Sequence, residues 1–206
     1  MLRKGKIVLF IQLSQSGTLH FHLDPANETS YLAYLILSRR LSQEKVALQI
    51  AEQMSDFLLH GAITNAVNMP SVTAEEAPKL RPYMKLAELL GSFAGQLTGD
   101  GLKAVRIEYE GHVGKLNRRP LTCLALKGLL GPLLESVNMV NAPVIARERN
   151  IDITETTHDR PGDYQTLIKL IVTTDRGERS VSGTLFGGDK PRMVDIKGIP
   201  VEAEWS

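Results

Sequence analysis

The chain has 206 residues, 43% of them hydrophobic and 23% charged, and its 24 basic residues nearly balance its 23 acidic ones. This composition is typical of one globular domain with a sizeable core, with or without an appendage. Because phosphate neutralisation needs a clear basic surplus, the net charge of +1 argues against nucleic acid as a partner. The single cysteine, Cys123, excludes an internal disulfide framework. Its apolar surroundings favour a small buried hydrophobe over a catalytic thiol.

The first residues carry a charged head and a short apolar stretch, but no cleavage site for a secretory signal follows. No apolar run is long enough to span a bilayer, so we expect a cytoplasmic protein that does not enter membranes. Strands are predicted over residues 7–13 and 18–23, and a short helix over 30–41. His20 and His22 would share one face of the second strand. Without further ligands at suitable spacing, we interpret them as solvated histidines rather than a metal site.

An amphipathic helix is predicted over residues 44–59, where Val46, Ile50, Met54 and Phe57 form an apolar stripe. A glycine after it supplies the cap, and a short strand is predicted over 62–67.

A linker rich in Pro and Glu is predicted over residues 71–82, with Ser71 or Thr73 capping a turn. The next helix should run over residues 82–97, with Pro82 in its first turn. A half-buried strand is then predicted over 104–110.

The segment 121–134 is apolar on almost all sides, which predicts a helix buried all round. Gly128 and Gly131 within it cost about 1 kcal/mol each relative to Ala, which indicates the close approach of another backbone. Pro143 should begin a further helix that ends near residue 150.

The remainder of the chain is predicted to form strands joined by tight turns. The expected strands cover residues 151–155, 166–174, 180–186, 192–196 and 199–204, with a polar loop over 157–163. Together these elements predict an α/β (α+β-like) domain. Its mixed sheet should carry helices mainly on one face and end in C-terminal antiparallel hairpins.

Several motifs resemble the D-3-phosphoglycerate dehydrogenase family, whose members carry out the first step of serine biosynthesis. These motifs are Val46-Ala47-Leu48-Gln49-Ile50, Asn65-Ala66-Val67-Asn68-Met69-Pro70, Leu126-Lys127-Gly128-Leu129-Leu130, Val140-Asn141-Ala142-Pro143 and Ser182-Gly183-Thr184-Leu185-Phe186-Gly187. They occur in unbroken order across residues 44–204. The resemblance implies that residues 44–61 are similar to the last helix of the family's catalytic domain. Residues 62–206 are similar to its intervening domain, also called the allosteric substrate-binding domain.

The resemblance also implies what is missing. No Gly-x-Gly-x-x-Gly follows a strand, so the sequence has no dinucleotide-binding motif for NAD, the cofactor of the full-length family. Where the family has its catalytic histidine this chain has Tyr34, whose phenol is a poor acid-base group near neutrality. We therefore expect no catalytic residues, no cofactor and no metal in this chain. Residues 1–43 are unmatched, and we expect them to derive from a shifted reading frame, a truncated gene or an artificial fusion of coding segments. The nucleotide-binding and serine-sensing ACT domains are expected to be absent.

The family resemblance favours a regulatory and oligomerisation domain that forms homo-oligomers and binds a small anion, either 3-phosphoglycerate or phosphate. Such a site needs clustered cationic donors. The candidates are Arg118, Arg119, His158, Arg160, Lys190 and Arg192.

Two alternatives stay open from sequence. One is a ligand-free oligomerisation module or the remnant of a truncated gene. The other is an independent enzyme that uses Glu108, Glu110 and His112, although a solvated strand edge accounts better for these side chains.

Overall fold

The computed structural model describes residues 10–13, 19–22, 28–66, 69–99, 101–159 and 162–205, with side chains described at 39, 40 and from 42 onward. Its contacts divide the chain into two compact units, residues 1–55 and 56–206. Within the described residues, no helix is both long and apolar enough to cross a membrane.

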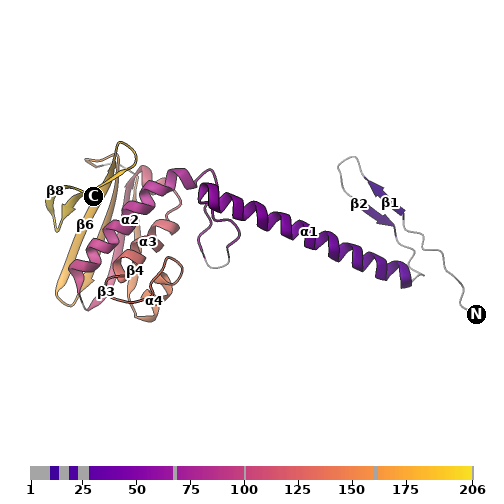
Figure 1. The fold of residues 1–206 in the computed structure, drawn as a ribbon. Helices are drawn as coiled ribbons and strands as arrows, with labels where there is room; N and C mark the ends of the chain where they lie inside the picture. The colour runs from indigo at the N-terminus through magenta and orange to yellow at the C-terminus, as the bar shows by residue number, and fades with distance from the viewer. Residues whose placement is uncertain are drawn as a thin grey trace, which may run out of the picture. The chain divides into compact units, whose positions relative to one another are not determined.

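The first unit holds a two-stranded antiparallel ribbon and most of a long helix (Figure 1). The ribbon pairs β1 (Phe10–Leu13) with β2 (Leu19–His22). The remaining residues of the predicted strands 7–13 and 18–23 lie outside the described residues, as do the side chains of His20 and His22. The two helices predicted over 30–41 and 44–59 are one continuous helix, α1 (Glu28–His60). That correction has a simple cause, because no glycine or proline interrupts this stretch.

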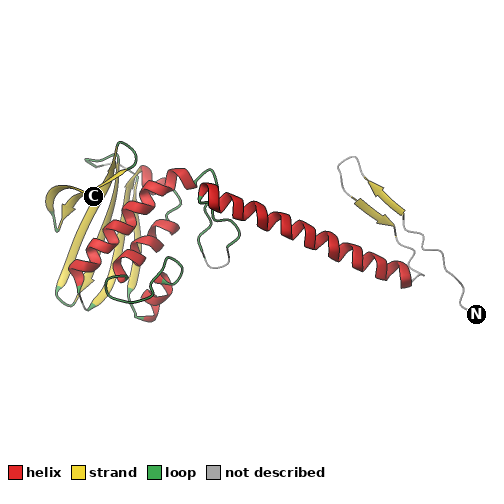
Figure 2. Ribbon diagram, viewed as in Figure 1, coloured by secondary structure: helices red, strands yellow, loops and turns green. Residues whose placement is uncertain are grey.

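The second unit is built on a six-stranded mixed sheet with the strand order β4-β3-β5-β6-β7-β8 (Figure 2). The strands are β3 (Leu102–Gly111), β4 (Asp152–His158), β5 (Thr166–Thr174), β6 (Gly177–Phe186), β7 (Lys190–Ile196) and β8 (Ile199–Glu204). Only β3 and β4 run parallel, and every other neighbouring pair is antiparallel. The predicted mixed sheet and its C-terminal antiparallel hairpins are therefore confirmed.

The main helices α2 (Ala77–Thr98) and α3 (Arg119–Leu130) pack on each other, and α2 lies over β5, β6 and β7 on one face of the sheet. The core fills the space between these layers. On β3 the alternation places Val105, Ile107 and Tyr109 in the core, each at most 1% exposed. A third helix, α4 (Ala142–Glu148), and the short 3-10 helix η1 (His112–Lys115) complete the unit.

Helix α3 is held close to α2 by glycines on both helices. A Cβ on Gly128 would overlap the Glu88 carbonyl of α2, and one on Gly91 would overlap the Ala125 carbonyl of α3. The backbone contact predicted from Gly128 is therefore confirmed. The predicted extent of this helix is wrong, because α3 ends at Leu130 and Gly131 is its C-cap.

Helix α2 begins earlier than predicted, because Pro78 rather than Pro82 occupies its first turn. Pro82 lies inside the helix, where it donates no backbone hydrogen bond. Of the two predicted capping residues, Ser71 and Thr73, the structure confirms Thr73. The Thr73 hydroxyl accepts from the Glu76 N–H at 3.2 Å, and a Glu76 carboxylate oxygen accepts from the Thr73 N–H at 3.2 Å.

The strand predicted over residues 62–67 is wrong within the part that the structure describes. Ile63 makes only an isolated antiparallel bridge to Val72, and Val67 lies outside the described residues. The later elements agree better with prediction. Helix α4 has Pro143 in its first turn, and β4 extends the predicted strand 151–155 as far as His158.

Candidate functional site

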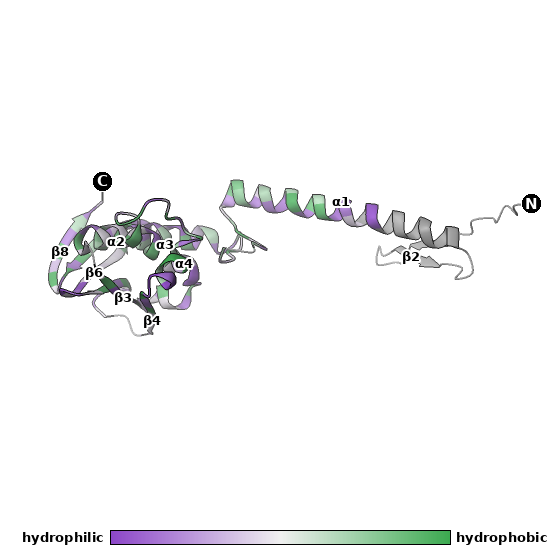
Figure 3. Cartoon of the chain, turned by 90° about the horizontal axis from the view of Figure 1, so that it is seen from below, coloured by the Kyte–Doolittle hydropathy of each residue, from purple (hydrophilic) through white to green (hydrophobic). Residues whose placement is uncertain are grey.

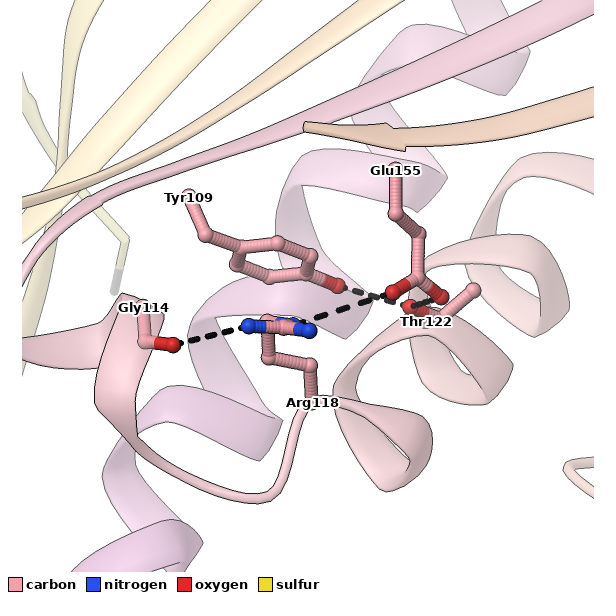
Figure 4. A network of polar contacts seen from close by, with 5 residues as sticks. All are labelled: Tyr109, Gly114, Arg118, Thr122 and Glu155. Carbon is pink, nitrogen blue, oxygen red and sulfur yellow. Dashed lines mark hydrogen bonds and ion pairs between the residues drawn. The ribbon is translucent and has the colours of Figure 1, made fainter. Parts of the chain in front are cut away.

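The N-terminus of α3 and the edge strand β4 bring several polar side chains together. Pro120 suits the first turn of α3, so Arg118 and Arg119 stand where the helix begins. Thr122 lies in the first turn itself and is 7% exposed. Glu155 projects from the middle of β4 toward this turn (Figure 4).

Thr122 and Glu155 form a directional hydrogen-bond chain with Tyr109 of β3. The Thr122 hydroxyl donates to Glu155 Oε1 at 2.7 Å, because an ionised carboxylate can only accept. The Thr122 oxygen must then accept from the Tyr109 hydroxyl, 2.9 Å away. Burial raises the pKa of Tyr109, which keeps the phenol protonated and able to donate. This hydrogen-bond chain joins β3, α3 and β4. It explains why the apolar helix α3 contains the polar residue Thr122.

Arg118 is engaged within the fold rather than free for a ligand. Its NH1 group donates to the Gly114 carbonyl at 2.9 Å, and its Nε lies 3.8 Å from Glu155 Oε2. Figure 4 shows Tyr109, Arg118 and Thr122 converging on this region. Arg118 therefore fixes η1 and balances the Glu155 charge.

Arg119 lines a pocket of about 500 Å³ that lies among α3, α4 and β4. Cys123, one turn further along, also lines this pocket and is half-buried, whereas the sequence predicted a small buried hydrophobe. Burial raises the pKa of the Cys123 thiol, and Glu155 acts in the same direction while Arg119 opposes both. Among the described residues, no carboxylate lies within ion-pair distance of Arg119.

The other predicted anion ligands are not brought together with Arg118 and Arg119. His158 ends β4 and is exposed, while Arg160 lies outside the described residues. Lys190 and Arg192 belong to β7, near the opposite edge of the sheet. Arg192 pairs there with two carboxylates of β8 and lies over the Phe186 ring, 4.6 Å from its centroid. The candidates therefore divide between the two edges of the sheet.

In the alternative acid-base grouping, Glu108 is held in ion pairs on the sheet. Strand β3 lies inside the sheet, which corrects the interpretation of these side chains as a strand edge. Glu108 is 17% exposed and pairs with Arg106 at 3.3 Å and Lys169 at 4.0 Å. His112 lies beyond the strand, in η1. In the part of the chain that the structure describes, no three His, Cys, Asp or Glu side chains are placed to hold a metal ion.

Comparison of the sequence with known protein families identifies the domain that contains this site. Residues 79–197, more than half of the chain, match the model of the D-3-phosphoglycerate dehydrogenase intervening domain. The chain belongs to this family.

D-3-phosphoglycerate dehydrogenases are similar to it over most of its length. The protein from Synechocystis is 38% identical over 170 residues, covering 82% of this chain and 31% of its own length. The Methanocaldococcus jannaschii protein is 34% identical over 161 residues, covering 78% and 30% respectively. The Bacillus subtilis protein is 32% identical over 170 residues, covering 82% and 32%. The chain thus spans about a third of the length of these relatives.

The family match lies within the second compact unit and runs from α2 to the end of β7. Because the Synechocystis match includes 82% of the chain, it begins at about residue 37 or earlier. The C-terminal half of α1 is therefore shared with the relatives as well.

The sequence analysis did not identify Tyr109, Thr122 and Glu155 as hydrogen-bond partners. The one available signal was a threonine inside the most apolar helix.

Proposed function

We propose that this chain serves as a regulatory and docking domain of a cytoplasmic D-3-phosphoglycerate dehydrogenase in serine biosynthesis, and that it does not itself catalyse hydride transfer. Support comes from the family match, which falls on the intervening domain. The proposal is consistent with the sequence, where no dinucleotide fingerprint follows a strand. NAD would then be bound by the longer enzymes of the family and not by this chain.

We propose further that the domain binds a small anion, 3-phosphoglycerate or phosphate. The observation that carries this proposal is the state of the cationic side chains. Arg118 and Arg192 are neutralised by carboxylates, whereas no described carboxylate pairs with Arg119, His158 or Lys190. Guanidinium, imidazolium and ammonium groups without internal partners can donate charge-assisted hydrogen bonds to an anion.

Thermal melting of the complete chain tests the effector. A ligand present at ten times its Kd and bound only to the folded state adds about 1.4 kcal/mol of stability, which should raise the melting temperature by about 3–5 °C. The variants Arg119→Gln and Lys190→Gln locate the site, because only the change at the binding edge should abolish the shift. Arg149→Gln, an exposed arginine after α4, is the matched control. An unchanged melting temperature of the wild type with both anions would refute the proposal that the domain binds one of them.

A second candidate function, a ligand-free oligomerisation module, is favoured by the exposed stripe on α1. At about 100° per residue, four apolar side chains of its C-terminal half fall on an arc of about 80°. Val46, Ile50, Met54 and Phe57 are between 51% and 59% exposed, and Figure 3 shows green and purple alternating around this helix. Pairing with a second copy would remove this apolar surface from water.

Sedimentation velocity separates this candidate from a monomeric effector domain. The wild-type chain should sediment as a dimer or larger assembly, and Ile50→Glu should dissociate it. Gln49→Glu, on the polar face of the same helix, should leave the assembly intact. A monomeric wild type at about 50 µM, where interfaces of μM affinity are populated, would exclude the oligomerisation role.

A further inference from the structure

The pocket lined by Arg119 and Cys123 combines apolar walls with charged groups. It has a volume of about 500 Å³ and lies among α3, α4 and β4. Its apolar lining comes from several segments that are distant in sequence: Met69, Leu126, Met139, Val140, Pro143 and Ile153. A concave apolar surface with a few polar groups is the usual form of a small-molecule site.

Two arginines line this pocket and are free to meet a negative charge. Arg119 comes from the start of α3 and Arg147 from the last turn of α4, and both lie at the surface. Neither is within ion-pair distance of a carboxylate among the described residues. Guanidinium groups bind a carboxylate through paired N–H donors, which fixes the ligand's orientation as well as its charge.

The pocket also contains one carboxylate, whose charge is balanced within the fold. The Glu155 carboxylate lines the pocket, with Thr122 donating to one oxygen and Arg118 near the other. Cys123 also lines the pocket, together with Arg119 and Glu155. Because Arg118 balances Glu155, Arg119 and Arg147 provide the unbalanced positive charge that attracts an anion.

We infer that this pocket binds a small organic carboxylate with an apolar body. The carboxylate would contact Arg119 and Arg147, and the apolar body would cover the walls near Leu126 and Ile153. Inorganic phosphate would use the arginines but leave these walls in water. The inference goes beyond the effector proposed above and does not depend on it.

Cys123 is a built-in reporter of occupancy, since it is the one cysteine of the chain and lines the pocket. The experiment measures the rate of Cys123 alkylation by iodoacetamide in the complete chain. The probe is 3-phenylpropanoate, its neutral match is 3-phenylpropanamide, and inorganic phosphate is the third arm. The rate with each compound is divided by the rate without it for the same variant, because substitution at Arg119 itself alters the thiol.

The carboxylate should slow alkylation in a saturable manner, while the amide and phosphate should not. The double variant Arg119→Gln/Arg147→Gln should bind the carboxylate about tenfold more weakly or worse, since a hydrogen bond to a charged group contributes about a decade of affinity. Arg149→Gln should behave as wild type. Melting curves establish that each variant is folded, which is expected because none of the three arginines is buried.

Three results would overturn the inference. Equal protection by the amide would show a pocket that does not recognise charge. Equal protection by phosphate would show an anion site indifferent to the apolar body. No protection by the carboxylate at any concentration, with alkylation proceeding normally, would show that the pocket does not bind this class. Failure of the proposed effector is scored separately, by the absence of a melting shift with 3-phosphoglycerate or phosphate, so the two failures are distinguishable.

Discussion

Replacing Gly128 with alanine should destabilise the intervening domain, although alanine is the better helix former. The new Cβ would overlap the Glu88 carbonyl and stand 2.7 Å from the Ser92 nitrogen, and both are backbone atoms of α2. No side chain can rotate to relieve this contact, so the helices must separate by about 1 Å. Such a shift loosens the core around Leu90 and Leu129, both 0% exposed.

The magnitude follows from two opposing contributions. Overpacking of a close-packed interior costs up to about 3 kcal/mol, and the gain in helix propensity returns about 1 kcal/mol. The free energy of unfolding should therefore fall by about 2 kcal/mol. For a domain of this size, the melting temperature should fall by about 4–8 °C.

Urea and thermal unfolding followed by circular dichroism provide the assay, and Gly131→Ala is the matched control. Gly131 is exposed at the end of α3 with a helical backbone conformation, φ −55° and ψ −43°. Its substitution should change the free energy of unfolding by less than about 0.5 kcal/mol. A Gly128→Ala variant as stable as the wild type would refute the close backbone contact between α2 and α3.

The hydrogen-bond chain and the sheet edge give the remaining predictions. Thr122→Val should lower the free energy of unfolding by about 1–3 kcal/mol in urea titrations, because the Tyr109 hydroxyl stays buried without its acceptor; an unchanged midpoint would contradict the assigned chain. Burial raises the pKa of Tyr109, so its contribution to stability is complete below about pH 10 and is lost above it, at about 1.4 kcal/mol per pH unit. Tyr109→Phe should lack this part of the alkaline loss when the two proteins are melted side by side. Arg192→Ala should cost about 1 kcal/mol or less, since Glu202 and Glu204 are exposed; a larger loss would mean that the Phe186 contact stabilises more than the ion pairs.

The sequence predicts those parts of the fold that depend on local patterns. The alternation on β3 identifies its core face, and Gly128 in an apolar helix indicates a close backbone contact. Both signals are carried by the residues themselves. Where two local signals compete, prediction fails. Pro78 and Pro82 are both suited to the first turn of a helix, and Pro78 occupies the first turn of α2.

Features that depend on distant partners could not be predicted in this way. Thr122 and Glu155 are separated by 33 residues, and their contact depends on the parallel pairing of β4 with β3. The interior position of β3, which makes Glu108 a member of an ion-pair cluster, also follows from topology rather than from local sequence. The division of the predicted anion ligands between two sheet edges has the same origin.

The central claim is that this domain binds an effector and leaves hydride chemistry to other parts of the family's enzymes. The most direct test of this claim is isothermal titration of 3-phosphoglycerate into the complete chain. The same sample is then tested for NADH formation from NAD. The account predicts a saturable heat of binding with at most one ligand per chain and no NADH. Formation of NADH, or the absence of any binding heat up to millimolar ligand, would contradict it.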